Sequence, residues 1–226
     1  MKKNQAPTYR LESNPTVERV LNAALTVFTQ KGYDGTSIRE IRTRAGVTQP
    51  VIYYHFGNKL ELYKALVEQS MRLFFEQLQE LLQPLSSPWE RLSAIMKHHF
   101  EFHRRYPERS AFIYSAFFGL PRVIESQHLL DMGYHLLDMV TGEIVALQEE
   151  GTIRSGDAKL MALALLGTFN MFKMRHLLEP QFELSEERAD QLLRDFLHGV
   201  GTEEKAKPAG RRLHATPGRP GDEPMS

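Results

Sequence analysis

The sequence predicts an all-α protein of about nine helices, and three observations support this fold class. Apolar residues recur at three- and four-residue spacing through most of the chain. No segment shows the strict alternation of apolar and polar residues that is typical of a half-buried strand. Capping residues, glycines and prolines divide the periodic segments into lengths typical of helices.

Composition agrees with a globular protein and excludes several classes of site. The chain has 226 residues, of which 42% are hydrophobic and 25% charged, both ordinary values. The absence of cysteine excludes disulfides, a thiolate nucleophile and a cysteine zinc site. No apolar run approaches the roughly 18–20 residues of a membrane span. The N-terminus has two lysines but no apolar core after them, so we expect no signal peptide, a cytoplasmic location and no membrane partner.

The net charge of zero hides an asymmetry between the two ends of the chain. Residues 1–65 contain ten Lys or Arg and five Asp or Glu, a balance of +5, and residues 66–226 carry the compensating −5. A basic N-terminal part is suited to neutralising the phosphates of a nucleic acid.

The first helix is predicted from Pro15, because proline is favoured at a first helical position and Asn14 precedes it. It ends near Gly32. Its apolar stripe comprises Val17, Val20, Leu21, Ala24, Val27 and Phe28.

Residues 35–59 predict two short helices joined by a turn. Ser37 and Glu40 fit a capping box at the start of the first of them. Gly46 supplies the left-handed residue at its end. Thr48 is placed to cap the second helix, and Pro50 is tolerated in its first turn. This is the pattern of a helix-turn-helix, which holds its second helix in the DNA major groove.

Two residues of the second helix, Ile52 and Phe56, lie four apart and are expected to face the core. The residues expected to face largely outward are Thr48, Gln49, Val51, Tyr54 and His55, with Tyr53 at the edge. Two tyrosines and a histidine exposed on one short helix indicate a surface that meets a partner.

The order and spacing of these residues resemble the DNA-binding domain of the tetracycline-repressor (TetR/AcrR-type) family of bacterial transcriptional regulators. The resemblance covers residues 17–66 strongly, and the rest of the chain by architecture. Arg42 departs from the family pattern, which usually has a small residue there. The matching residues are Ala24, Phe28, Gly32, Tyr33, Thr36, Ser37, Ile38, Arg39, Glu40, Ile41, Ala45, Gly46, Val47, Thr48, Tyr53, Phe56 and Lys59.

The resemblance implies a double-stranded DNA operator as partner and roles for individual residues. Gln49 is the candidate for a base contact, since its amide matches adenine, and Val51 is the candidate for a thymine methyl. Tyr53, Tyr54, His55 and Lys59 are candidates for phosphate contacts. Thr36 and Ser37 would present a helix N-terminus to phosphate. Thr48 is as suited to capping as to DNA, and Pro50 completes the candidate set.

Four segments are expected along the chain. Residues 1–14 form a flexible arm, 15–58 the DNA-binding domain, 59–201 a helical ligand-binding and dimerisation domain, and 202–226 a disordered tail. The helix at 59–82, which Asn58 and Glu61 are placed to cap, links the two domains. Further helices are predicted from a capping box at Ser87 and Glu90 to about 106, then to about 118, from Pro121 to about 151, over 160–175 and over 186–200.

The last two helices favour a homodimer. Ten of the thirteen residues at 160–172 are apolar, so that helix must be covered on more than one side. The final helix carries an apolar stripe that comprises Ala189, Leu192, Leu193, Phe196 and Leu197. We expect a four-helix interface through the helices near 158–178 and 186–200, although both could simply be core. A palindromic operator also requires a twofold protein.

The resemblance further implies a small-molecule effector in a cavity among helices four to eight. Aromatic and methionine side chains there favour an apolar or aromatic effector, although each such side chain is more often part of an ordinary core. The candidates are Phe100, Phe102, His103, Tyr114, Phe117, Phe118, Met132, Met139, Phe169, Met171 and Phe172.

Other functions stay open. His98, His99 and His103 suggest a metal site, since the last two lie four apart on one helix, but no cysteine or clear carboxylate completes it, and we predict neither metal nor cofactor. No nucleophile motif, phosphate loop or His-Glu-x-x-His pattern occurs, so an all-helical metal-dependent enzyme is a remote alternative. The sequence does not distinguish a repressor from an activator or from a ligand-independent DNA-binding protein. Of these we expect a repressor that a ligand releases from DNA.

Overall fold

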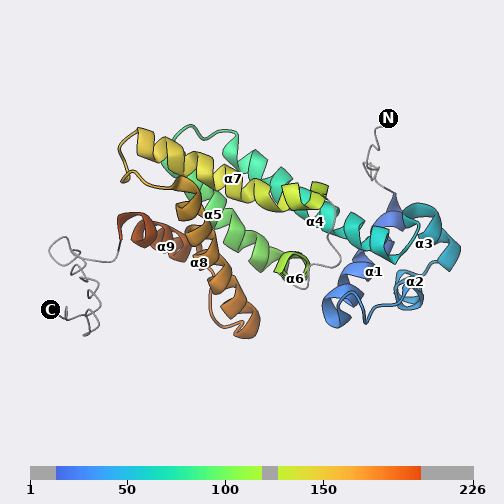
Figure 1. Cartoon of the computed structure of the whole chain (residues 1–226). Helices are drawn as coiled ribbons and strands as arrows, with labels where there is room; N and C mark the ends of the chain where they lie inside the picture. Colours follow the sequence, from blue (N-terminus) through green and yellow to red (C-terminus); the bar gives the residue numbers. More distant parts are fainter. Residues whose placement is uncertain (1–13, 119–126, 200–226) are drawn as a thin grey trace, which may run out of the picture.

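The computed structural model describes residues 14–118 and 127–199, and all regular structure in these ranges is α-helical. Figure 1 shows a compact group of helices at one end, a long helix leading away from it, and a bundle at the other end. The helices are α1 (Pro15–Lys31), α2 (Ile38–Ala45), α3 (Gln49–Phe56), α4 (Lys59–Leu82), α5 (Pro88–Arg105), α6 (Pro107–Phe118), α7 (Gln127–Glu149), α8 (Ala158–Leu178) and α9 (Glu186–His198).

Side-chain caps set the helix starts where the sequence predicts them in three cases. Asn14 Oδ1 accepts hydrogen bonds from the backbone N–H groups of Thr16 and Val17 at the start of α1. The predicted capping box of Ser37 and Glu40 is present at α2. Asn58 caps α4 by accepting from the N–H of Glu61 at 2.9 Å. Each cap satisfies donors that the first helical turn leaves without an intrahelical partner.

Two other predicted caps are wrong. Thr48 and Ser87 both occupy N-cap positions, but neither side chain makes a cap hydrogen bond. In α3, Pro50 is the second helical residue and lacks an N–H donor that a cap would satisfy. In α5, Pro88 is the first helical residue, a position where proline is favoured, as Pro15 is in α1.

The later boundaries shift by a few residues. α8 extends beyond the predicted range at both ends, and Asp157 caps its start by accepting from the N–H of Leu160. α9 ends at His198. The predicted start at Pro121, the N-terminal arm up to residue 13 and the tail from 202 lie outside the described residues.

Two hydrophobic cores organise the molecule, and α4 contributes to both. The first core joins α1, α2 and α3 to the first half of α4, and includes Phe112 and Ala116 of α6. The second joins the other half of α4, from Phe74 to Leu82, to α5, α7, α8 and α9. The same helix is therefore embedded in both cores.

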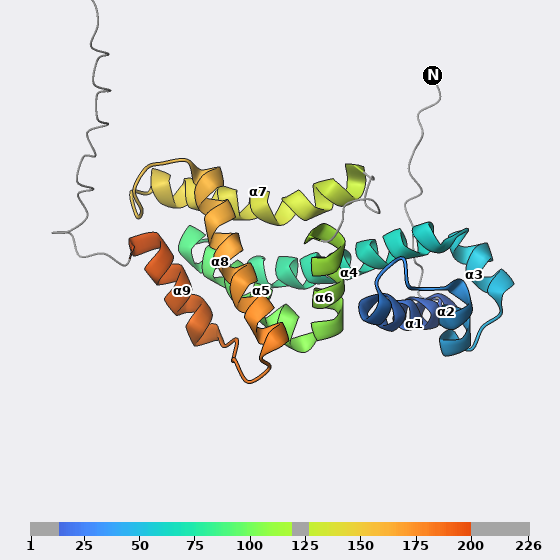
Figure 2. The same cartoon turned by 60° about the horizontal axis from the view of Figure 1, so that its bottom comes forward.

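Within the larger domain α5 is central. It packs against α4, α6, α7, α8 and α9. α8 and α9 lie at the end of the molecule far from α1, α2 and α3 in both views (Figure 2). No helix of the described ranges is both long and apolar enough to cross a bilayer.

Candidate DNA-binding and ligand-binding sites

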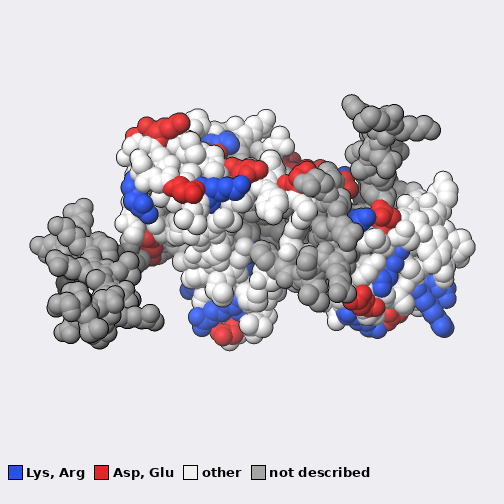
Figure 3. All heavy atoms as spheres, in the orientation of Figure 1, with Lys and Arg blue, Asp and Glu red and all other residues white. Residues whose placement is uncertain are grey.

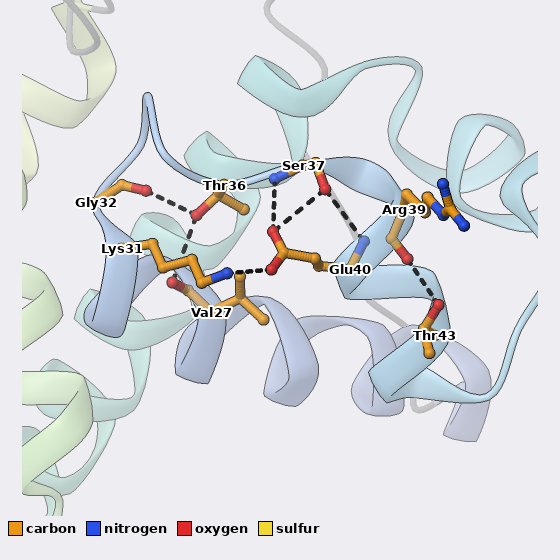
Figure 4. A network of polar contacts seen from close by, with 8 residues as sticks. All are labelled: Val27, Lys31, Gly32, Thr36, Ser37, Arg39, Glu40 and Thr43. Atoms are coloured by element: carbon orange, nitrogen blue, oxygen red, sulfur yellow. Dashed lines mark hydrogen bonds and ion pairs between the residues drawn. The ribbon is translucent and has the colours of Figure 1, made fainter.

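The turn between α1 and α2 is fixed by Thr36. Its hydroxyl donates to the carbonyl of Gly32 at 2.7 Å and lies 3.4 Å from the carbonyl of Val27. Figure 4 shows these contacts closing the turn over the end of α1. The side chain is only 4% exposed. Its predicted presentation to phosphate is therefore corrected, because the hydroxyl is buried and engaged inside the protein.

Ser37 and Glu40 connect the same turn to α2. The Ser37 hydroxyl accepts from the Glu40 N–H at 3.3 Å, and the Glu40 carboxylate accepts from the Ser37 N–H and hydroxyl. Glu40 also pairs with Lys31 at the end of α1 (Figure 4), and this pair lowers the pKa of the Glu40 carboxyl. Ser37 itself is exposed, so it keeps the place predicted for a phosphate contact.

α3 presents an outward face as the sequence predicts. Ile52 and Phe56 are buried in the first core. Tyr54 is 84% exposed and Tyr53 43%. Gln49 Nε2 donates to the Tyr53 hydroxyl at 3.1 Å, which links the two side chains across one helical turn. This contact leaves the Gln49 amide oxygen available as an acceptor.

The remaining members of the predicted set flank these residues. Thr48 and Pro50 are exposed, and Val51 and His55 are half-buried. The rings of His55 and Tyr54 meet edge to face with centroids 5.0 Å apart. The Thr48 hydroxyl does not cap α3, so it is available for a contact with DNA.

Lys59 lies at the start of α4, is half-buried and makes two contacts within the protein. Its Nζ donates to the Thr36 carbonyl at 2.8 Å and lies 4.3 Å from the centroid of the Tyr33 ring. A phosphate contact would therefore use the ammonium N–H groups that these contacts leave over. Lys59 has a structural role that the sequence does not reveal.

Three arginines of α2 extend the basic surface beyond the predicted residues. Arg39 and Arg44 are exposed and Arg42 is half-buried, and none takes part in an ion pair among the described residues. In Figure 3 Lys and Arg atoms appear on the lower side of the N-terminal domain, whereas the tip formed by α3 carries no charged residue. The signal in the sequence is that these arginines fall outside the apolar positions of α2, so that they do not face the core.

A cavity of about 440 Å³ lies among α4, α5, α6, α7 and α8. Of the predicted lining, Phe102, Tyr114 and Phe117 do line it. Side chains not predicted also contribute, among them Met71, Phe74 and Phe75 of α4. The rest of the lining consists of His99, Ser110, Ile113, Leu130, Tyr134, Leu136, Leu137, Leu163, Leu166, Gly167, Asn170 and Lys173.

Five other candidates are corrected because they do not line this cavity. Phe100 and Phe169 are fully buried in the second core with ring centroids 4.7 Å apart. Phe172 and Met139 pack against the same core. Met171 is 66% exposed. The side chains of Phe118 and Met132 lie outside the described residues.

The histidines of α5 are buried and each has its own partner. His98 Nε2 is 3.0 Å from the carbonyl of Phe74, and His103 Nδ1 is 2.7 Å from the Ser110 hydroxyl. His103 thus lies behind the cavity wall formed by Ser110. The prediction that His103 lines the cavity is corrected. The described residues contain no group of three or more metal-ligating side chains that could hold an ion.

The most unusual cavity residue, Lys173 of α8, was missed. It is 8% exposed, and its Nζ lies 2.5 Å from His99 Nε2. Burial lowers the pKa of Lys173 to about 7. Burial, and then the charge of Lys173, lower the pKa of His99 well below its ordinary value. Burial first, and then Lys173 and His176, lower the pKa of His103 to about 4.

α8 also presents an apolar face to the outside. Leu160, Leu163, Gly167, Met171 and Leu178 are exposed and recur at helical spacing along one side. The opposite side of α8 is buried in the second core. On α9 the apolar stripe faces that core instead, so the exposed apolar surface belongs mainly to α8.

Comparison with known proteins agrees with this architecture. Residues 20–66 match the family described as bacterial regulatory proteins, tetR family. The HTH-type transcriptional activator FasR of Mycolicibacterium smegmatis is 34% identical over 93 residues, which cover 41% of this chain and 42% of FasR. The negative transcriptional regulator IcaR of the Staphylococcus epidermidis biofilm operon icaADBC is 34% identical over 59 residues, covering 26% and 32%. The chain therefore spans less than half the length of these curated relatives.

The whole fold is shared with solved structures. The fatty acid degradation regulator FadR from Bacillus halodurans has a TM-score of 0.71 at 17% identity, over 84% of this chain and 98% of that one. The family match covers the helix-turn-helix, and the fold match adds the larger helical domain. Together they show a helix-turn-helix of the tetR family of bacterial regulatory proteins in residues 20–66, within a chain that has the fold of solved regulators.

Proposed function

We propose that the protein is a ligand-responsive transcriptional repressor that binds a palindromic operator as a homodimer in the cytoplasm and is released by a small, mainly apolar effector. The observation that carries the proposal is the exposed face of α3, where Gln49, Tyr53 and Tyr54 face outward from a buried base of Ile52 and Phe56. This is the arrangement by which a recognition helix reads base edges in the major groove.

On DNA, Gln49 is the residue for a base contact, because one amide supplies both the donor and the acceptor that adenine requires. Val51 is placed for a thymine methyl. Tyr53, Tyr54 and His55 are placed for phosphates on either side, which position the helix without reading sequence.

Phosphate contacts from α2 and its N-terminus add to the affinity. Ser37 is exposed at the start of α2, and Arg39, Arg42 and Arg44 carry charges without internal ion pairs. Such contacts release counterions and make binding strongly dependent on salt. Lys59 and Thr48 complete this set.

The exposed face of α8 supports the dimer. A stripe of large apolar side chains at helical spacing is costly to leave in water and matches itself across a twofold axis. A dimer places two α3 helices in successive major grooves, about 34 Å apart.

Effector control follows from the position of the cavity. Met71, Phe74 and Phe75 of α4 line it, and α4 continues into the core of the DNA-binding domain. A ligand that prefers one position of α4 shifts the spacing of the two reading heads. The shift depends on the difference in its affinity for the two states and not on tight binding alone.

Activation is the second candidate, and the name of FasR favours it, since that relative is a transcriptional activator. The two functions use the same DNA-binding surface. They differ in where the operator lies relative to a promoter.

Selection of bound sequences from random duplex DNA tests the proposal. We expect one palindrome of two short half-sites, and a footprint whose position relative to the promoter separates repression from activation. Enrichment no greater than random, at low salt and with full-length protein, contradicts the proposal.

A further inference from the structure

The cavity is mainly apolar, and we call the part lined by the contacting side chains of Lys173 and His99 its polar end. Most of its lining is aliphatic or aromatic, and its polar side chains are His99, Ser110, Tyr114, Tyr134, Asn170 and Lys173. Its volume of about 440 Å³ lies in the lower part of the range of roughly 300–1,000 Å³ for small-molecule sites. No Asp or Glu of the described residues lines it.

At the polar end, Lys173 and His99 are both more than nine-tenths buried and in contact with each other. Among the described residues no ion pair involves Lys173. A buried ammonium without a counter-charge is costly, and native proteins normally pair it. The neighbouring charged or titratable groups are also basic, since His103 of α5 and His176 of α8 face each other with ring centroids 5.5 Å apart.

The hydrogen-bond inventory indicates the same missing partner. When the ammonium donates to His99 Nε2, the neutral imidazole carries its proton on Nδ1. Nδ1 of His99 is buried and has no partner in the structure. The polar end therefore offers unused donors from both residues and calls for an acceptor that carries negative charge.

From these contacts we propose that the effector is a monocarboxylic acid with an apolar body, and that its carboxylate pairs with Lys173 beside His99. This rests on the proposed function only in calling the ligand an effector. Tyr134, Leu163 and Gly167 are the exposed part of the lining, and Lys173 and His99 the buried part, so the carboxylate enters first. The apolar body then contacts Phe74, Phe102 and Leu166.

The charge of the ligand is what the cavity must recognise, so the test compares matched ligands. Titration calorimetry without DNA measures binding of acids from butanoate to hexadecanoate, with phenylacetate and phenylbutanoate, each beside the alcohol of the same carbon skeleton. We expect at least one acid to bind about tenfold to a hundredfold more tightly than its alcohol, the range for a charge-assisted hydrogen bond.

Lys173→Met removes the ammonium and keeps the length of the side chain. We expect the variant to bind acid and alcohol within about threefold of each other, with the alcohol affinity preserved. Lys159→Met is the matched control, since Lys159 lies on the same helix but is exposed and outside the cavity. It should retain the full preference.

Three outcomes overturn the inference: no acid in the series binds, acids and alcohols bind the wild type equally, or Lys173→Met keeps the preference. Adding the best acid to the complex with selected DNA is a separate measurement. Binding that depends on Lys173 without an effect on DNA would contradict the proposed function and leave the inference intact. Selective DNA binding by a protein that shows no preference for acids would contradict the inference and leave the proposed function intact.

Discussion

Gln49 is the residue whose contribution to sequence recognition is most direct in the proposed complex. Gln49→Ala removes the amide while leaving α3 intact, since the side chain is exposed. We expect a loss of about 1–3 kcal/mol in operator binding and relaxed selectivity at one base pair of each half-site. Repeating the random-sequence selection with the variant measures both. An unchanged consensus would contradict the base contact, and Gln30→Ala, an exposed glutamine of α1, is the control.

The Tyr53 hydroxyl orients Gln49, and this gives a second prediction at the residue scale. Tyr53→Phe keeps the ring but removes the acceptor 3.1 Å from Gln49 Nε2. We expect weaker operator binding by about 0.5–1.5 kcal/mol, the usual net value of one hydrogen bond. Competition with random DNA separates this loss from a phosphate contact, because only an effect through Gln49 reduces specificity. Tyr54→Phe should change specific and non-specific binding equally.

The sequence predicts residues well where helical period decides their orientation, and poorly where packing does. Ile52 and Phe56 had to face inward once α3 was recognised. Phe100 and Phe169 could not be separated from cavity residues, because an aromatic side chain has the same period whether it fills a core or borders a hollow. Lys173 was missed because its burial depends on which side of α8 meets α5, a tertiary fact.

At the scale of elements, Lys59 joins the start of α4 to the turn between α1 and α2. Lys59→Ala removes the hydrogen bond to the Thr36 carbonyl and the contact with the Tyr33 ring. We expect the free energy of unfolding to fall by about 1–2 kcal/mol and DNA binding to weaken for all sequences. Urea unfolding and binding at several salt concentrations measure the two effects.

The salt dependence distinguishes the roles of Lys59. If Lys59 also contacts a phosphate, the slope of log K against log salt falls by about one unit. Arg44→Ala is the comparison, because Arg44 is exposed on α2 and makes no internal ion pair. It should flatten the slope without changing stability. Unchanged stability in Lys59→Ala would contradict the structural role.

Helix starts were predictable where a side chain caps the helix, as at Asn14, Ser37 and Asn58. The starts after Thr48 and Ser87 were also predicted, but neither side chain makes the cap hydrogen bond that was expected of it. The local sequence shows which residues can cap a helix, but only the folded geometry decides whether the cap hydrogen bond forms.

At the scale of the whole molecule, the exposed face of α8 should hold two copies together. Met171→Glu places a charge in the centre of that face without touching the cavity. We expect a monomer by analytical ultracentrifugation at micromolar concentration and loss of palindrome binding, because a charge buried in an apolar interface is not solvated. Leu81→Glu, on an exposed position of α4, should remain a dimer. A wild-type monomer would contradict the interface.

The two proposed surfaces of α8 meet, because Leu163 and Gly167 belong both to the exposed stripe and to the lining of the cavity. The partner subunit would therefore cover part of the open side of the cavity. Ligand binding and dimerisation would then depend on each other. The factor by which the ligand changes the affinity of the two subunits would equal the factor by which dimerisation changes the affinity for the ligand.

Lys173 makes the stability of the whole molecule depend on pH in a predictable direction. Its pKa is about 7 when folded, against an ordinary value of 10.5. Between these values the unfolded chain binds the proton more strongly, so this group makes the free energy of unfolding rise with pH. Lys173→Met should therefore be more stable than wild type at pH 7, by about 1–3 kcal/mol, since a buried unpaired charge is removed.

That advantage should shrink as the pH rises towards 10, where the buried lysine of the wild type is neutral. Urea unfolding at fixed protein concentration from pH 6 to pH 10 measures the difference between the two proteins. Other groups titrate too, and the lowered pKa values of His98, His99 and His103 reduce stability as the pH falls below about 6.5. These effects largely cancel in the difference, and Lys159→Met should show no trend. A stability difference that stays constant from pH 7 to pH 10 would show that Lys173 is already paired with an anion in the free protein.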